Sequence, residues 1–405
     1  MPILRLQQSP DRSNDGDNHY NVGVTFDGRT AESRFTFAVP DQQKNGWTGA
    51  AINTMQGLRI LYDHTHRPVE WARLVDEISP RFVDPASGSP VAGNDDQWSM
   101  IVEYRMRIAI DQGDISSAER YQRHHLNWIR QRSASALAAP RESLDDAGRN
   151  RIRTLCLSIE RLGWIQSAKG DGECLRSLAE ALTLCRRNRD RPTTAVVVSH
   201  IGNAYREVHS IRNYDKAEKW LHRSVGLCPA GVHMGRAAAL ADIGFLSLVR
   251  FREAAAAGSD PVDLHAHLIT AAQYYTEALG ATPTDAGHRV ATILNQMGVI
   301  MSELGNILIG DTWQDEAIAH FNNSIRILEA LSDRVRAAGV RFNAAGAMLR
   351  ANRLADAWQY AAASTQDFDS CNSPQDVAKA GKLLVQIEAA MKATGSAPPG
   401  NPPPP

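Results

Sequence analysis

The spacing of apolar residues divides the chain into a short strand-like segment and a long helical one. In residues 1–40 apolar and polar positions alternate, most clearly at Tyr20, Val22, Val24 and Phe26, and alternation is typical of half-buried strands. Asp27-Gly28 follows them as a two-residue hairpin turn, because glycine adopts positive φ at no steric cost. Residues 1–40 are therefore predicted to form a small antiparallel β meander.

After Pro40 the apolar residues recur every three or four positions, which predicts helices. Residues 41–94 are predicted to form two helices and a surface loop rich in Pro, Gly, Ser and Asp. Residues 95–373 are predicted to contain helices only, and residues 374–394 to form one capping helix. Residues 395–405 are expected to be a disordered tail, because such a proline-rich sequence cannot bury apolar surface.

The helical part contains a repeated pattern. Each repeat has a small residue on one helix, called the A position here, and an Ala or Ser on the next helix, called the B position. The A positions are Gly163, Gly202, Gly244, Gly298 and Ala345. The B positions are Ala181, Ser224, Ala278, Ser324 and Ser364. From each B position to the next A position there are 20 or 21 residues, whereas from A to B the number varies from 18 to 34.

A constant spacing between repeats and a variable one within them is what a stack of helical hairpins requires. A slip of one residue turns a helix by about 100° and would move its apolar side out of the core. A longer hairpin tip reaches into solvent and disturbs neither helix. We therefore expect an all-α solenoid of about six hairpins, with a weaker first hairpin at 98–132 and extended tips around 250–267 and 303–315.

The residue types and their order resemble the tetratricopeptide repeat (TPR) family, over roughly residues 95–395. In that family a Leu-Gly pair is followed by Tyr, then Ala, an aromatic residue, Ala and Pro. The best match in this chain is Ile201-Gly202 with Tyr205, Ala217, Leu221 and Pro229. The repeats here are 39 to 54 residues long, against about 34 in the family. The resemblance implies a right-handed superhelix. It also implies non-catalytic binding of a protein or peptide along the concave side, which is lined by the first helix of each hairpin.

A second resemblance concerns context. An N-terminal strand meander before long, Arg-rich and Ala-rich repeats is similar to bacterial proteins that accompany caspase-like (CHAT) peptidases or signalling NTPases. This implies an adaptor of such an enzyme in defence or signalling as an alternative function.

Composition excludes several classes of function. The net charge is −1, with 44 basic and 45 acidic residues, so nothing favours general binding to nucleic acid or to an anionic membrane. The five cysteines have no CxxC spacing, which argues against a disulfide framework or a zinc ribbon and favours buried free thiols. With neither a secretory signal nor a membrane span in the sequence, the expected location is cytoplasmic.

No motif of an enzyme is present. The chain has no GxxxxGK[ST] phosphate loop, no GxSxG elbow and no HExxH. Neighbouring histidines such as His64 and His66 do not share a helix face, which argues against a metal site. We therefore expect no enzyme activity, no cofactor and no metal.

The binding groove is predicted at positions that flank the small A-helix residue. These are Glu160, Trp164, Asn203, Arg206, Glu207, Phe245, Asn295, Val299, Ser302, Phe342 and Arg350. Trp164, Phe245 and Phe342 are candidate apolar anchors, and Arg206 and Arg350 candidate partners of a carboxylate. The expected partner is a protein or peptide.

Two further partners are considered. The helix from Arg120 to Arg132 carries several arginines interleaved with Tyr121 and Trp128, a mixture that can follow a phosphate backbone. A nucleic-acid-linked regulator is therefore an alternative, although the neutral total charge argues against it. A homodimer through the edge of the meander is also considered, because unpaired strand edges recruit strands.

Overall fold

The computed structural model describes residues 3–8, 18–26, 29–31, 37–39, 55–59, 61–62, 67–85, 87–231, 233–308, 311–371 and 373–395. The chain divides into two units, Met1–Gln112 and Gly113–Pro405. The first predicted hairpin, 98–132, spans this boundary, so its two helices belong to different units. Most of the predicted tail lies outside the described residues.

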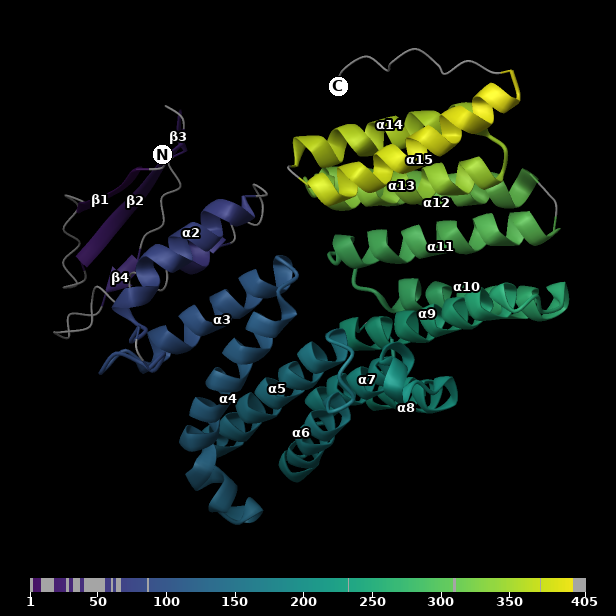
Figure 1. The fold of residues 1–405 in the computed structure, drawn as a ribbon. Helices are drawn as coiled ribbons and strands as arrows, with labels where there is room; N and C mark the ends of the chain where they lie inside the picture. Colours follow the sequence, from purple (N-terminus) through teal and green to yellow (C-terminus); the bar gives the residue numbers. More distant parts are fainter. Residues whose placement is uncertain are drawn as a thin grey trace. The chain divides into compact units, whose positions relative to one another are not determined.

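Unit 1 begins with four short strands (Figure 1). β1 (Ile3–Gln8) pairs antiparallel with β2 (Asn18–Phe26), and the short strands β3 (Arg29–Ala31) and β4 (Phe37–Val39) both pair antiparallel with β2. For these strands the structure describes the backbone pairing but not the side chains. The packing of the meander as a β element and the dimer through its edge therefore remain predictions.

The described part of unit 1 includes α2 (Pro68–Ile78) and α3 (Asp95–Asp111), with the short 3-10 helix η1 (Ser79–Arg81) between them, and residues 55–59 and 61–62 are helical as well. Trp71 of α2 lies edge-on to Tyr104 of α3, with 5.0 Å between ring centroids. The indole nitrogen of Trp98 donates a hydrogen bond of 2.8 Å to the carbonyl of Gly88. These contacts are part of the described core of unit 1, which also includes Val75 and Ile101.

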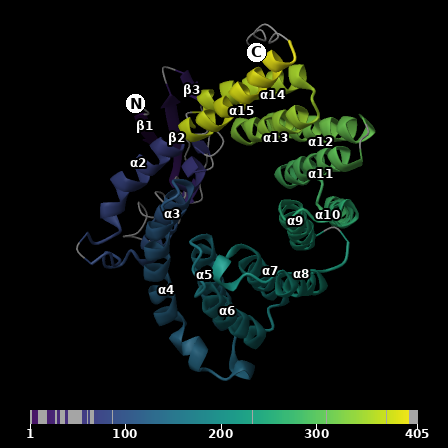
Figure 2. The same cartoon turned by 45° about the vertical axis from the view of Figure 1, so that its right-hand side comes forward.

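Unit 2 is an all-α stack of antiparallel hairpins, as the sequence predicts (Figures 1 and 2). Within its described residues, α4 (Ile115–Ala138) comes first, five hairpins follow, and α15 (Pro374–Ala393) comes last. The hairpins are α5 (Asp146–Ala168) with α6 (Cys174–Asn188), α7 (Arg191–Glu207) with α8 (Tyr214–Leu227), α9 (Met234–Ala256) with α10 (Pro261–Ala281), α11 (Gly287–Leu308) with α12 (Asp311–Ala330), and α13 (Arg334–Arg350) with α14 (Leu354–Ser370). The first helix of each pair is called its A helix below, and the second its B helix.

The A positions lie where the two helices of a hairpin cross. A Cβ atom added to Gly202 would be 2.7 Å from Cγ of Leu221, and one added to Gly298 would be 2.7 Å from the ring of Phe321. Ordinary carbon contacts are about 3.5–4.0 Å, so only glycine lets these helices approach so closely. Gly163 and Gly244 face Leu178 and Tyr275 in the same way. The predicted role of the small residues is thus confirmed.

The B positions tie the same hairpins together by hydrogen bonds. Each serine at a B position donates from its hydroxyl to the carbonyl of a buried alanine, seven residues before the A position of its hairpin. The pairs are Ser224 with Ala195, Ser324 with Ala291, and Ser364 with Ala338, each at 2.8 Å. Because both groups are buried, loss of either would leave a polar atom without its partner.

The cysteine prediction is wrong for one pair. Cys156 of α5 and Cys185 of α6 form a disulfide across their hairpin. Cys174, Cys228 and Cys371 are free. The sequence spacing of 29 residues gave no sign of the pairing, because it depends on the register in which α6 packs on α5.

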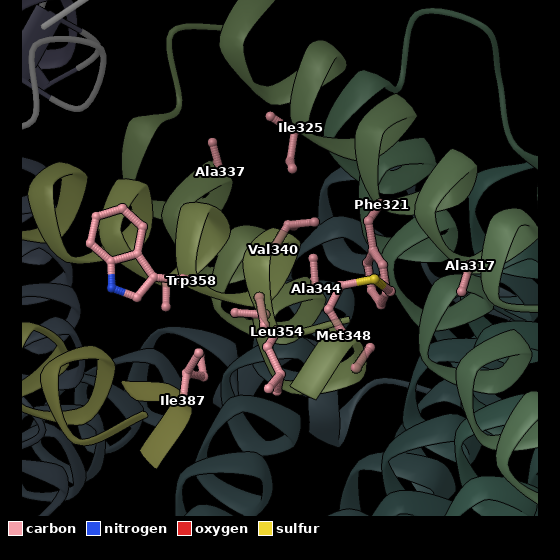
Figure 3. Packing of buried hydrophobic residues seen from close by; sticks show 14 of the residues in the cluster. Ala317, Phe321, Ile325, Ala337, Val340, Ala344, Met348, Leu354, Trp358 and Ile387 are labelled. Atoms are coloured by element: carbon pink, nitrogen blue, oxygen red, sulfur yellow. The ribbon is translucent and has the colours of Figure 1, made fainter. Parts of the chain in front are cut away.

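Successive hairpins share continuous apolar cores. In the C-terminal core, side chains from four helices converge, namely Phe321 of α12, Met348 of α13, Trp358 of α14 and Ile387 of α15 (Figure 3). α15 thus covers the last hairpin. No helix in the described part of the chain is both long enough and apolar enough to cross a membrane.

Candidate binding face on the A helices

Consecutive A helices lie next to one another on one side of the stack. α5 contacts α7, α7 contacts α9, and α11 contacts α13. Side chains that point away from the B helices therefore form a shared surface across neighbouring hairpins.

Helix geometry decides which side chains reach this surface. At about 100° per residue, residues six or two before the A position, and one or five after it, point about 100–160° away from the crossing. Residues four after it point only about 40° away. The predicted groove residues fall into these two groups, except for Glu160, Asn295 and Phe342, which lie three residues before the A position and point about 60° away from the crossing.

Arg206 and Ser302 belong to the second group, and the structure buries both. Their relative exposures are 7% and 0%. The carbonyl of Ser302 accepts a hydrogen bond of 3.3 Å from Gln314 of α12, so the B helix covers this residue. The prediction that Ser302 lines a groove is therefore wrong, and Arg206 contributes as a buried support.

A polar pair links α5 to α7. Nδ1 of His200 on α7 is hydrogen-bonded to the carboxylate of Glu160 on α5. Burial alone lowers the pKa of His200, but the hydrogen bond with Glu160 and the charges of Asp242 and Glu207 outweigh it, so that the pKa is raised. The histidine is therefore protonated more readily than a free one and pairs with the carboxylate.

A second polar group links α7 to α9. The carboxylate of Asp242 accepts hydrogen bonds from Ser199 at 2.9 Å and from Asn203 at 3.2 Å. Arg206 donates to the carbonyl of Asp242 at 3.2 Å and to the carboxylate of Glu207 at 2.6 Å. Together with the bond between His200 and Glu160, these hydrogen bonds hold α5, α7 and α9 in one fixed arrangement.

Arg206 also stacks on an aromatic ring. Its guanidinium carbon lies 4.6 Å from the ring centroid of Phe245. The expected role of Arg206 as a partner of a ligand carboxylate is not favoured by this arrangement, because the side chain is buried and already bonded to Asp242 and Glu207. It instead holds the ring of Phe245 in place.

Exposed apolar side chains lie beside these polar groups. Leu157 and Trp164 of α5 are each 39% exposed, and Val196 of α7 is 41% exposed. Leu157 lies three residues before Glu160 and Trp164 four after it, so all three share one side of α5. Val196 lies four residues before His200 on α7. We call this surface the α5–α9 face, made of Leu157, Glu160, Trp164, Val196, His200, Asn203, Glu207, Asp242 and Phe245.

The remaining predicted residues lie on α11 and α13. The amide of Asn343 donates a hydrogen bond of 3.1 Å to Asn295, and Arg350 forms an ion pair of 3.2 Å with Glu303. Val299 packs on the C-terminal core. Asn295 and Phe342 line a cavity of about 460 Å³. The predicted groove residues are thus distributed over two separate places and do not form one continuous site.

Sequence reasoning missed His200, Asp242, Leu157 and Val196. All four had a positional signal: Leu157 and Val196 lie six residues before Gly163 and Gly202, and His200 and Asp242 lie two residues before Gly202 and Gly244. Among the described residues, no group of three or more His, Cys, Asp or Glu side chains is arranged to hold a metal ion.

The arginine-rich helix proposed for nucleic acid is α4. Arg123 forms an ion pair with Glu119 at 2.7 Å, and Arg130 one with Glu180 at 2.8 Å. The guanidinium of Arg132 lies 4.5 Å from the ring of Trp128. These arginines are engaged inside unit 2, which gives no support to a phosphate-binding strip.

No protein-family model matches the chain. No curated protein matches it either. Among solved structures, Rap protein in complex with competence and sporulation factor is 13% identical, with 80% of this chain and 81% of that chain covered and a TM-score of 0.43. The apo quorum sensor NprR of B. thuringiensis is 12% identical, with 82% and 86% covered and a TM-score of 0.39.

The TPR2AB domain of yeast Sti1, solved with pHSP90, is 14% identical, with 72% of this chain and 99% of that chain covered and a TM-score of 0.25. The suspected likeness to TPR proteins is thus found again among solved structures. At these identities it concerns the fold alone. The hairpin crossings described above are the evidence for that fold.

Proposed function

We propose that this protein binds a protein or peptide partner without catalysis, through the α5–α9 face. The observation that carries the proposal is the combination of exposed apolar side chains with a fixed polar network on one side of three helices. Leu157, Trp164 and Val196 are open to solvent there. Binding surfaces commonly combine aromatic and aliphatic anchors with preorganised polar groups.

The charges of this face favour a basic partner segment. Glu160 is only 8% exposed and is paired with His200, and Arg206 is buried and bonded to Glu207, so Asp242 and Glu207 are the two carboxylates of this face that meet solvent. Glu207 is 49% exposed at its side chain and Asp242 27%, so both can be reached. We therefore propose a segment in which Lys or Arg side chains alternate with apolar ones.

The test is an affinity capture with three matched baits, the wild type, a Trp164→Glu/Val196→Glu variant and a Val262→Glu variant. Val262 is 74% exposed at the start of the B helix α10, so its replacement introduces the same chemistry away from the proposed face. Captured proteins are quantified by mass spectrometry after nuclease treatment, and the interacting segment is then measured by calorimetry with purified peptide.

The proposal requires a partner that the wild type and the Val262→Glu variant retain and the double variant loses. A single well-placed anchor contributes about 2 kcal/mol or more to such an interface, so the measured affinity should fall by at least about 30-fold. Equal capture by all three baits would show that this face is not used. A partner that is captured without nuclease but lost after nuclease treatment would indicate that nucleic acid mediates the interaction.

A further inference from the structure

The cavity at the C-terminal end of unit 2 has the features of a separate ligand site. Its volume of about 460 Å³ lies within the range of about 300–1,000 Å³ typical of small-molecule sites. It is lined by side chains of five helices, α11 to α15, and we call it the α11–α15 cavity. Its lining is apolar at Leu328, Val335, Val340, Phe342 and Phe368.

One of the residues that line the cavity has no side chain. Gly339 of α13 is among its lining residues, and a Cβ atom added to this glycine would meet nothing within 4 Å. The A-position glycines behave in the opposite way, since their missing side chains are needed for a close helix crossing. A glycine inside a helix costs about 1 kcal/mol relative to alanine, and no packing contact of Gly339 explains that cost here.

Polar groups in the wall define what the cavity can bind. Asn343 donates one hydrogen bond to Asn295, and an amide side chain has further donors and acceptors. Two cations, Arg336 and Lys379, also line the cavity, against one carboxylate, Asp376. The lining thus carries a net positive charge beside an apolar floor.

Both cations are available to a ligand. Arg336 is 60% exposed at its side chain and lies 3.3 Å from Asp333, and Lys379 is 67% exposed and lies 2.9 Å from Asp376. Each pair joins residues three apart on a surface helix turn, where ion pairs contribute less than about 1 kcal/mol. A ligand anion can therefore recruit these cations at little cost.

We infer that the α11–α15 cavity binds a carboxylate attached to an apolar or aromatic body of two to three residues in size. The body packs on Phe342 and Phe368, an amide group of the ligand bonds to Asn295, and the carboxylate faces Arg336 and Lys379. Such a group is provided either by the end of a peptide or by a free organic acid. This inference goes beyond the proposed function, because it does not depend on the α5–α9 face.

The test uses N-acetyl-phenylalanine as the probe, followed by ligand-observed NMR and titration. The neutral probe N-acetyl-phenylalanine amide should bind more weakly by up to about fivefold, the effect of losing one exposed charge interaction. Equal binding of the acid and the amide would overturn the assignment of an anionic ligand. N-acetyl-Ala-Ala-Phe distinguishes a peptide end from a free organic acid as the natural ligand. If this peptide binds more tightly than N-acetyl-phenylalanine, the ligand is a peptide end. If the two bind equally, it is a free acid.

Two glycine variants test the location. Gly339→Leu should fill the cavity and abolish probe binding, whereas Gly381→Leu on α15 should leave it unchanged. Gly381 is a matched control, because it also lies inside a helix, its added Cβ would meet nothing within 4 Å, and it does not line the cavity. Binding that persists in Gly339→Leu would overturn the proposal.

Lys379→Glu is the second variant, in case the first disturbs folding. It replaces an exposed side chain and should weaken binding of the acid by about tenfold through charge reversal. Unchanged binding by this variant would contradict the predicted role of the cation. The Trp164→Glu/Val196→Glu protein should bind the probe as well as the wild type, so failure of the proposed face and failure of this cavity are distinguishable.

Discussion

The helix crossings make a sharp prediction about glycine. Replacing Gly202 by alanine would place a Cβ 2.7 Å from Cγ of Leu221 and 3.1 Å from the carbonyl oxygen of Ala217. Leu221 is fully buried and has no free space to move into. The two helices must therefore separate, and overpacking of this kind costs about 1–3 kcal/mol.

Helix propensity acts in the opposite direction. Alanine in a helix interior is favoured over glycine by about 1 kcal/mol, so Gly202→Ala should destabilise unit 2 by about 0–2 kcal/mol in net. Gly339→Ala gains the same propensity without any clash, because nothing lies within 4 Å of the added atom. It should stabilise unit 2 by about 1 kcal/mol.

The comparison of these two variants isolates the packing effect, since the propensity difference cancels. Their thermal midpoints, followed by circular dichroism, should differ by about 2–4 °C for each kcal/mol of overpacking. Hydrogen exchange measured by mass spectrometry should place the loss of protection in α7 and α8. Identical midpoints for Gly202→Ala and Gly339→Ala would refute the reasoning that the A positions must be small.

Three further predictions concern single interactions. Ser224→Ala removes a buried hydrogen bond between the helices of its hairpin and should lower the free energy of unfolding by about 1 kcal/mol, as measured by urea denaturation. Because the pKa of His200 is raised by Glu160, its contribution to stability should be fully present below about pH 6.5, the pKa of unfolded histidine, and should be lost as pH rises through the folded pKa. NMR titration gives that pKa directly, and a His200→Gln variant should lack this pH dependence. The disulfide between Cys156 and Cys185 closes a loop of 29 residues. Its reduction should lower the free energy of unfolding by roughly 3–4 kcal/mol in the chain-entropy model. Thermal unfolding with and without reductant measures this loss, and an unchanged midpoint would argue against the disulfide.

The repeat architecture could be predicted because its determinants are local. A small residue at each crossing is visible in the sequence, and so are helix ends. Gly258, with a φ of 72°, lies just after α9, and Asp260 caps α10 by accepting a hydrogen bond of 2.8 Å from the backbone nitrogen of Val262. Both features depend on residue type, because glycine is common just after a helix and aspartate just before one.

The site could be predicted only in part, because its contacts join residues far apart in the sequence. Glu160 and His200 are 40 residues apart, and no spacing rule pairs them. The cavity around Gly339 likewise depends on five helices, so a glycine within a helix gave no indication of it. Arg206 is buried because it points only about 40° away from the crossing. The sequence prediction chose residues near each A position without considering this angle, so it did not separate Arg206 from surface positions.

The division of each A helix into two sides explains how such a stack can acquire a binding function. Positions near the crossing, such as Gly202 and Ala195 seven residues earlier, face the B helix and are restricted in size and chemistry. The residue after the A position lies about 100° away and is free of that restriction. It is Trp164 in the first hairpin, Asn203 in the second and Phe245 in the third.

This freedom has a consequence for the proposed function. Replacing Trp164, which is 39% exposed, should lower the free energy of unfolding by less than the roughly 3–5 kcal/mol that loss of a fully buried tryptophan costs. Binding and folding can therefore be separated by substitution on the α5–α9 face. A large loss of stability in the Trp164→Glu protein would mean that this tryptophan belongs to the core, and the recognition role proposed for it would fail.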